Sequence, residues 1–222
     1  MFISVDGIDG AGKSTQLDLL EKWLVSQGKA VSRFRDPGAT QLGEAVREIL
    51  LHREEIPLSM RSEMLLYMAA RAQLVEEQIR PALASGKTVV CDRYLLANVV
   101  YQGSAGGLDI EDIWQVGQIA TGSLRPDITI VFDLDTSIAL QRVGSGQDRL
   151  EKRGFKYFQA VRQGFLNQIN RASDNSIVID AAPAPEVVHQ KVIDYLTKLL
   201  FAQIVDYSFN ASSTDSCNHP ET

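Results

Sequence analysis

The chain has 222 residues, 45% of them hydrophobic and 23% charged, which fits one α/β domain with a full core. Its net charge of -6 and its lack of a basic tract argue against a protein that holds a nucleic acid polymer by its backbone. No segment approaches the roughly 20 apolar residues of a membrane span, and the N-terminus lacks a secretory signal pattern, so we expect a cytoplasmic protein that binds no membrane. The cysteines, Cys91 and Cys217, match no disulfide or metal spacing, and Cys91 is expected to pack in the core.

Short apolar runs ending at glycine or an acidic residue predict strands, and they alternate with segments of helical spacing. The predicted strands cover residues 2–6, 30–34, 88–92, 128–135 and 176–180. Helices are predicted from Leu17 to a stop at Gly28, over 42–50, over 59–84 with a bend or break near Pro81, and over 107–122. A short helix is predicted from Thr136, another helix before the last strand, and a final helix from about Ala184.

This alternation of apolar strands with helices predicts a three-layer α/β fold, a five-stranded parallel sheet with helices on both faces. We expect one domain over residues 1–205. Residues 206–222 lack apolar periodicity and are expected to be disordered.

The stretch "GIDGAGKS" joins the first predicted strand to the first predicted helix and has the spacing G-x-x-x-x-G-K-[ST] of a phosphate-binding P-loop. Its glycines let backbone N–H groups approach phosphate oxygens, and its lysine bridges the terminal phosphates. This motif predicts a P-loop NTPase fold that binds ATP. The candidate ATP-binding residues are Gly7, Ile8, Asp9, Gly10, Ala11, Gly12, Lys13, Ser14 and Thr15.

Magnesium is the expected cofactor, since the Ser14 hydroxyl of such a loop is a magnesium ligand. A second ligand is expected at the end of a neighbouring strand. Asp92 is favoured, because its strand stops there and basic and polar residues follow. Asp133 lies inside a longer strand, which favours a structural role.

Arginines in polar segments indicate that the phosphate passes to a second molecule rather than to water. No N-K-x-D motif of a water-attacking switch is present, and a glycine-bounded loop over 142–154 has the arginines of a lid that closes over ATP. Its candidates are Arg142, Arg149 and Arg153, with Arg149 favoured. Arg93 directly follows a strand end, where ligands bind in such sheets.

These stretches together resemble the thymidylate kinase family. The matching stretches are "DGIDGAGKST" (6–15), "RDPGATQLGE" (35–44), "YMAARAQL" (67–74), "DRYLLANVVYQG" (92–103), "LRPDITIVFDLD" (124–135) and "DRLEKRGFKYF" (148–158). The resemblance implies an enzyme that phosphorylates dTMP to dTDP with ATP and Mg²⁺, for dTTP synthesis, and it implies a homodimer.

The resemblance also implies roles by matching position. Asp9 would face the acceptor sugar and the magnesium shell, and Asp9, Lys13, Arg93 and Arg149 would be the catalytic residues. Arg93 would hold the dTMP phosphate, Tyr67 would stack on the base, and Tyr101 would exclude a 2′-hydroxyl. The remaining dTMP-binding candidates are Asp36, Pro37, Arg71, Asn98 and Gln102.

Some features depart from the family pattern. Asp36 and Tyr67 replace the glutamate and phenylalanine that the family often carries, and the lid has glycine and serine where a basic run is usual. Two alternatives therefore stay open: a kinase of another nucleotide or of a deoxynucleoside, and a nucleotide-binding protein without transfer chemistry.

Overall fold

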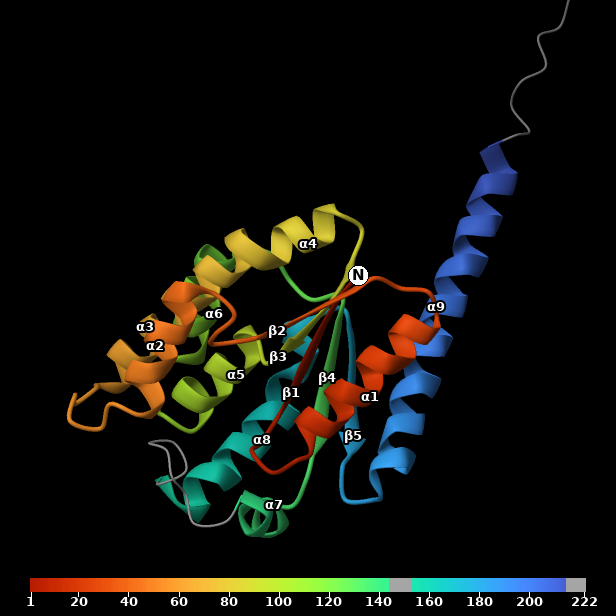
Figure 1. Ribbon diagram of the computed structural model, residues 1–222. Helices are drawn as coiled ribbons and strands as arrows, with labels where there is room; N and C mark the ends of the chain where they lie inside the picture. The colour runs from red at the N-terminus through yellow and green to blue at the C-terminus, as the bar shows by residue number, and fades with distance from the viewer. Residues whose placement is uncertain (144–152, 215–222) are drawn as a thin grey trace, which may run out of the picture.

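A computed structural model describes the backbone of residues 1–143 and 153–214, with side chains as far as residue 200. Its centre is a five-stranded, wholly parallel sheet (Figure 1). The strands are β1 (Phe2–Gly7), β2 (Val31–Arg35), β3 (Thr88–Asp92), β4 (Ile128–Asp133) and β5 (Asn175–Asp180), in the order β2-β3-β1-β4-β5. The predicted α/β fold and every predicted strand are confirmed.

Helices cover both faces of the sheet, as predicted. One face carries α1 (Lys13–Ser26) and α9 (Pro185–Thr214), which pack against each other. The other face carries α5 (Leu95–Asn98) and α8 (Phe155–Ala172), with α6 (Ile110–Thr121), α3 (Met60–Leu74) and α2 (Gln41–Leu51) farther out. The short α7 (Thr136–Val143) follows β4.

The strand order brings the candidate residues to one edge of the sheet. β3 and β4 flank β1, and Val5 lies in register with Asp92. Because chain connections leave β1 toward both sides, a crevice opens outside the carboxyl ends of these strands, where α/β proteins bind ligands. The segments after Gly7 and after Asp92 therefore meet at this crevice.

The long helix predicted over 59–84 is interrupted, as expected, near Pro81. A π-helical turn, η1 (Val75–Ile79), separates α3 from α4 (Arg80–Ala84). Proline has no N–H to donate and its ring displaces the preceding turn, so the ladder of hydrogen bonds changes register there.

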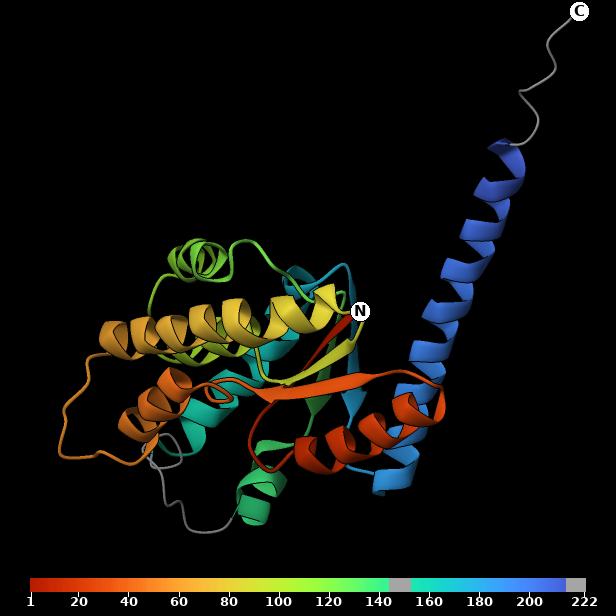
Figure 2. The same cartoon turned by 45° about the horizontal axis from the view of Figure 1, so that its top comes forward.

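Two structural features differ from the sequence expectations. Residues 95–104 form α5 and the π-helical η2 (Val99–Ser104), where no element was expected; almost all of this segment is buried, so it lacks the polar face that creates helical periodicity. Helix α9 continues to Thr214, into the tail expected to be disordered from residue 206, and Figure 2 shows it projecting past the sheet. No proline or glycine interrupts residues 186–214, so nothing in the backbone stops the helix.

Two side chains behave as predicted. Cys91 is fully buried in the core, and Cys217 lies outside the described residues. Asp133 is the last residue of β4 and does not lie inside a longer strand, so the reason given for its structural role is wrong; the role is instead supported by hydrogen bonds that it accepts from Arg162 Nε at 2.7 Å and Nη2 at 2.9 Å. Within residues 1–143 and 153–214, no helix is both long and apolar enough to cross a bilayer.

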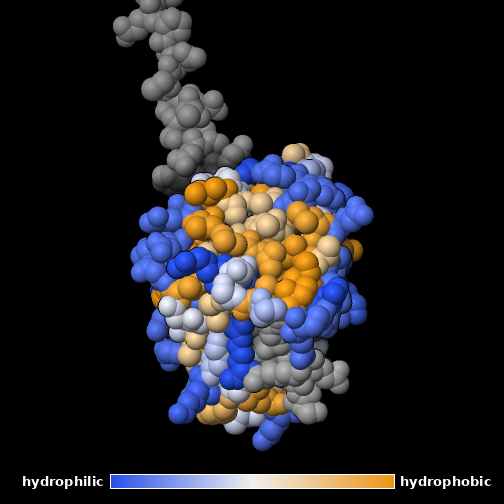
Figure 3. All heavy atoms as spheres, turned by 90° about the vertical axis from the view of Figure 1, so that its left-hand side faces the viewer, coloured by the Kyte–Doolittle hydropathy of each residue, from blue (hydrophilic) through white to orange (hydrophobic). Residues whose placement is uncertain are grey.

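One outer face of the molecule is broadly apolar. Figure 3 shows hydrophobic residues gathered on the side where α2, α3 and α6 lie in Figure 1, bordered by hydrophilic ones. Leu65 on α3 and Ile119 on α6 are 49% and 81% exposed. Contiguous exposed apolar areas of this kind mark interaction surfaces.

Candidate functional site

The predicted P-loop connects β1 to α1 with a backbone that only glycine tolerates at two positions. Gly7 and Gly10 have φ values of +138° and +83°. A Cβ atom at Gly10 would lie 2.3 Å from the carbonyl oxygen of Ala139, and one at Gly7 would lie 2.5 Å from that of Phe132. The loop therefore packs directly on β4 and α7, and its shape is fixed before any ligand binds.

Lys13, the first residue of α1, is turned back onto this loop. Its Nζ donates to the carbonyl oxygens of Gly7 (3.0 Å) and Ile8 (2.9 Å). Burial, reinforced by the nearby Arg93 charge, lowers the pKa of Lys13 to about 8. Burial and Arg93 thus disfavour the charged ammonium group despite the nearby Asp9 carboxylate, and a polyphosphate is the kind of ligand that would stabilise it.

A cavity of about 330 Å³, here named the loop cavity, opens in front of the P-loop. It is lined by Asp9, Gly10, Gly12, Lys13, Ser14, Arg35, Asp36, Arg47, Asp92 and Arg93. Seven of these residues are ionisable, four basic and three acidic, so the cavity has cations that an anionic ligand could contact.

A smaller cavity of about 90 Å³, here named the aromatic cavity, adjoins it. It is lined by Asp9, Asp36, Pro37, Arg47, Leu51, Tyr67, Arg71, Arg93, Ala97, Asn98, Tyr101 and Gln102. Every residue predicted from the resemblance to bind dTMP lines this cavity. The structure thus brings together candidates from the segments after β1, β2 and β3 and from α3, α5 and η2, which are far apart in the sequence.

Asp9 and Arg93 stand between the two cavities. Arg93 Nη2 donates to Asp9 Oδ1 at 2.5 Å, and Tyr101 Oη donates to Asp9 Oδ2 at 3.2 Å. Lys13 Nζ lies 3.6 Å from the same carboxylate. Burial of Asp9 opposes its ionisation, but the charges of Arg93 and Lys13 outweigh burial and lower the pKa of the carboxyl. An acid inside a P-loop is stable here because two cations flank it.

The backbone aims Arg93 into this position. Arg93 follows β3 with φ of +67°, in the left-handed region that non-glycine residues rarely adopt. Its N–H donates to Val5 O at 2.9 Å, which continues the pairing with β1. Strain of this kind persists where the surrounding structure holds it, and such residues cluster at functional sites.

The back of the aromatic cavity is polar and internally bonded. Arg71 is 1% exposed and donates through Nε to Asp36 Oδ2 at 2.6 Å. Its Nη1 donates to Asn98 Oδ1 at 3.0 Å, and Asn98 Nδ2 donates to Gln102 Oε1 at 2.6 Å. A ring-shaped ligand entering this cavity would meet Tyr67 and this ordered set of amide and guanidinium groups.

The two described lid arginines, Arg142 and Arg153, point to different places. Arg142 Nη1 lies 3.4 Å from Gly10 O, beside the P-loop. Arg153 instead donates to Glu63 and to Tyr157, away from the loop. Arg149 lies outside the described residues.

Three residues of the site were missed by sequence reasoning. Arg47 lines both cavities, Arg35 lines the loop cavity, and the buried Glu63 accepts from Gln102. Arg35 was inside a recognised motif, beside Asp36. Arg47 lies on a predicted helix just beyond that motif. A single charged residue on a helix does not indicate from sequence alone which part of the fold its side chain will contact.

Asp92 is the best-placed metal ligand among the described residues. It lines the loop cavity with Ser14, and its Oδ1 is buried without a hydrogen-bond partner. No group of three or more His, Cys, Asp or Glu side chains forms a metal centre in that part of the chain. One carboxylate plus a hydroxyl fits Mg²⁺, which keeps several waters and takes its other ligands from substrate phosphates.

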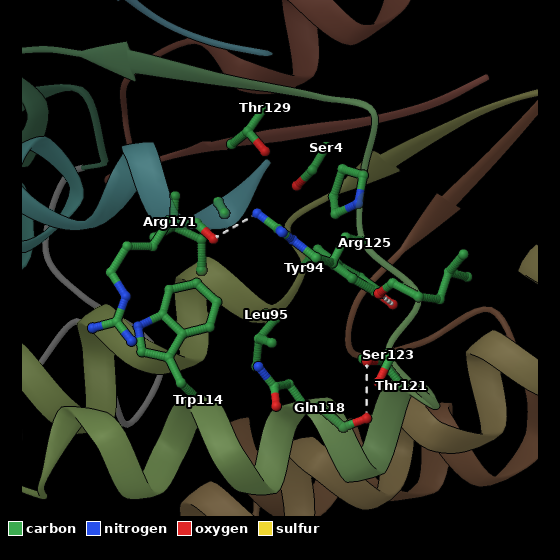
Figure 4. Close-up of a pocket in the computed structure, with 14 residues that line it drawn as sticks. Ser4, Tyr94, Leu95, Trp114, Gln118, Thr121, Ser123, Arg125, Thr129 and Arg171 are labelled. Carbon is green, nitrogen blue, oxygen red and sulfur yellow. Dashed lines mark hydrogen bonds between the residues drawn. The ribbon is translucent and has the colours of Figure 1, made fainter. Parts of the chain in front are cut away.

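A third cavity of about 370 Å³ lies apart from the P-loop, between α6 and the residues that line its other side, such as Ser4 and Thr129 (Figure 4). Arg171 packs over the Trp114 ring and is paired with Glu111, while Arg125 donates to Arg171 O. Its guanidinium groups are thus already paired within the protein, and no candidate residue lines it.

Comparison with known proteins agrees with this geometry. A family model described as thymidylate kinase matches residues 5–192. Thymidylate kinase of Rhodopirellula baltica is 44% identical over 86% of this chain and 77% of its own, and that of Thermoanaerobacter sp. (strain X514) is 42% identical over 90% and 98%. The crystal structure of thymidylate kinase from Ehrlichia chaffeensis superposes with a TM-score of 0.71 at 31% identity, covering 88% of this chain and 98% of that one.

A buried acid beneath the P-loop predicts a pH-dependent stability. Asp6 is 0% exposed, and burial raises its pKa from 3.8 to about 6 despite a hydrogen bond from Ser4. The folded state therefore holds this proton more tightly than the unfolded state. The resulting stabilisation is present below pH 3.8 and is lost as pH rises through 6.

We expect the free energy of unfolding of the parent protein to fall, relative to that of Asp6→Asn, by roughly 2–3 kcal/mol between pH 4 and pH 8. Urea unfolding of both proteins without nucleotide or Mg²⁺ measures this difference. A difference that stays constant across this range would contradict the burial of a titrating Asp6.

Proposed function

Because the chain belongs to the thymidylate kinase family and is an enzyme that phosphorylates dTMP, we propose that ATP occupies the loop cavity and dTMP the aromatic cavity. The observation that carries this proposal is that the two cavities share Asp9, Asp36, Arg47 and Arg93. Two nucleotides bound there would point their phosphates at the same charged boundary. The kinase domain would span residues 1–205, with the lid at 142–154.

On the donor side, backbone N–H groups of residues 7–15 hold the ATP phosphates at the N-terminus of α1. Lys13 exchanges its contacts with the carbonyls of Gly7 and Ile8 for phosphate oxygens. Ser14 and Asp92 would hold Mg²⁺, which would neutralise phosphate charge. Arg142, already beside Gly10, is the described lid arginine placed to approach these phosphates.

On the acceptor side, Arg93 holds the dTMP phosphate, with Arg47 beside it. In the free protein Arg93 pairs with Asp9, and an incoming phosphate takes over part of that pairing. Bidentate guanidinium contacts to phosphate are strong and directional. Asp9 is then released toward the sugar 3′ side and the magnesium shell.

The rest of the aromatic cavity recognises the nucleoside. Tyr67 stacks on the base, while Arg71, Asn98 and Gln102 contact its polar edge. Tyr101 is 4% exposed, and its ring and hydroxyl are fixed by Arg93 and Asp9. A ring so fixed leaves no space for a ribose 2′-hydroxyl, which gives preference for a deoxynucleotide.

Transfer in this arrangement depends on placing the two phosphates in line and neutralising charge between them. Arg93 and Lys13 supply positive charge on the two sides of the boundary, and Asp9 orients Arg93. No general base is required, since phosphoryl transfer proceeds with little proton movement in its transition state.

We further propose that the apolar face on α3 and α6 forms a homodimer contact. Burying Leu65 and Ile119 against the same surface of a second copy would remove exposed apolar area from water.

The acceptor panel tests the proposed function. With ATP and Mg²⁺, we expect ADP release to require an acceptor and to be far faster with dTMP than with UMP, CMP, AMP or GMP. The Tyr101→Ala variant is expected to narrow the ratio of kcat/KM for dUMP over UMP, which differ only at the 2′ position.

Equal turnover with another monophosphate would overturn the base assignment, and an unchanged dUMP/UMP ratio in Tyr101→Ala would remove the 2′ role. Slow ADP release that ignores dTMP would instead favour a nucleotide-binding protein without transfer chemistry.

The dimer contact is tested by Ile119→Asp, which places a charge in the apolar face. We expect sedimentation to show a dimer for the parent protein and a shift toward monomer for this variant. Val25→Asp, the same kind of change at a 57% exposed residue of α1 on the opposite face of the sheet, is the matched comparison. A parent protein that sediments as a monomer would refute the contact.

A further inference from the structure

Side chains at the back of the aromatic cavity form one continuous line of hydrogen bonds. The line starts at Asp36, passes through Arg71, Asn98 and Gln102, and continues from Gln102 Nε2 to Glu63 Oε1 at 2.8 Å. All its members are at least 97% buried. Water therefore does not satisfy these groups, and each must find its partner within the line.

The chemistry of Glu63 fixes the direction of this line. A carboxylate only accepts hydrogen bonds, so Gln102 must turn its NH₂ group toward Glu63 and its Oε1 toward Asn98. Asn98 must then donate through Nδ2, which leaves its Oδ1 beside the Arg71 guanidinium. Arg71 only donates, so the two ends of the line agree on one orientation of both amides.

This orientation places a donor next to an acceptor at the base-reading edge. Arg71 Nη1 is the donor and Asn98 Oδ1 is the acceptor, 3.0 Å apart; Nη1 also donates to Met68 Sδ at 3.2 Å, a weak acceptor that a base carbonyl would replace. Thymine presents the complementary pair, an accepting C4 carbonyl next to a donating N3–H. Cytosine presents the reverse, a donating amino group next to an accepting N3. Reversing the Asn98 amide would put a donor where thymine also donates.

Glu63 is itself held by a counter-charge. Arg153 Nη2 donates to Glu63 Oε2 at 2.5 Å, and Arg153 Nη1 donates to Tyr157 Oη at 2.7 Å. Tyr157 Oη in turn donates to Tyr101 O at 2.8 Å. A carboxylate that is 2% exposed is tolerated when such a partner compensates its charge. Arg153 therefore pairs with Glu63 and does not face the P-loop in this structure.

We propose that Glu63, paired with Arg153, is a positioning residue for base specificity: it holds the amides of Gln102 and Asn98 in the orientation that accepts thymine and rejects cytosine. The inference rests on the proposed placement of dTMP in the aromatic cavity. Glu63 contacts no substrate and acts through Gln102.

The decisive variant is Glu63→Gln, whose own NH₂ group can donate to Gln102, so that Arg71 alone is left to hold the two amides in one orientation. We expect the ratio of kcat/KM for dTMP over dCMP to fall about tenfold to a hundredfold, the range for a bidentate base contact. The change should appear as a higher KM for dTMP, with kcat altered much less. Glu76→Gln, which removes an exposed carboxylate paired with Arg80, should leave the ratio unchanged.

An unchanged ratio in Glu63→Gln, or an equal loss with both nucleotides, would overturn the proposal. Arg153→Met, which removes the counter-charge, is expected to lower the ratio in the same direction, and it decides the matter if Glu63→Gln does not fold.

The Asn98→Ala variant distinguishes a failure of the proposed Glu63 role from a failure of the proposed dTMP placement. An unchanged ratio in Asn98→Ala would show that the base binds elsewhere, so the proposed dTMP placement would fail. A lower ratio in Asn98→Ala with no change in Glu63→Gln would keep that placement and reject the role of Glu63.

Discussion

The contact between Arg93 and Asp9 is the interaction on which the rest of the site depends. It exists because β1 and β3 are parallel neighbours, so their carboxyl ends open at the same edge and the segments that follow them meet. The left-handed backbone of Arg93 turns its side chain across this edge. Asp9 lies between the two cations Arg93 and Lys13 and pairs with both. Each ion pair offsets part of the free-energy cost of burying the charges.

These three charges also divide the crevice. A chain with a net charge of -6 still presents Arg35, Arg47, Arg93 and Lys13 around one opening, so the overall charge says little about the local field. On one side the field is fixed by backbone amides of the loop, which suits a polyphosphate. On the other side it is carried by long side chains and backed by an aromatic cavity, which suits a nucleotide that must be both recognised and positioned.

The sequence predicted the architecture well because its signals are local. Strand runs, helix spacing and the P-loop each depend on a few neighbouring residues, and the residues predicted for the aromatic cavity came from motif resemblance. What it could not predict depends on partners distant in the chain: Glu63 meets Gln102 and Arg153 only in the fold, and Arg47 reaches the crevice from the middle of α2. The buried α5–η2 segment was missed for a related reason, since burial on all sides erases the amphipathic pattern.

The central claim is that Arg93 and Asp9 mark the boundary between two bound nucleotides. A crystal structure with dTMP and a non-hydrolysable ATP analogue tests it most directly. It should show the dTMP phosphate on Arg93, the analogue's phosphates on the P-loop, and Asp9 between them on the sugar side. Both nucleotides bound while Arg93 still pairs only with Asp9, or a dTMP phosphate remote from Arg93, would contradict it.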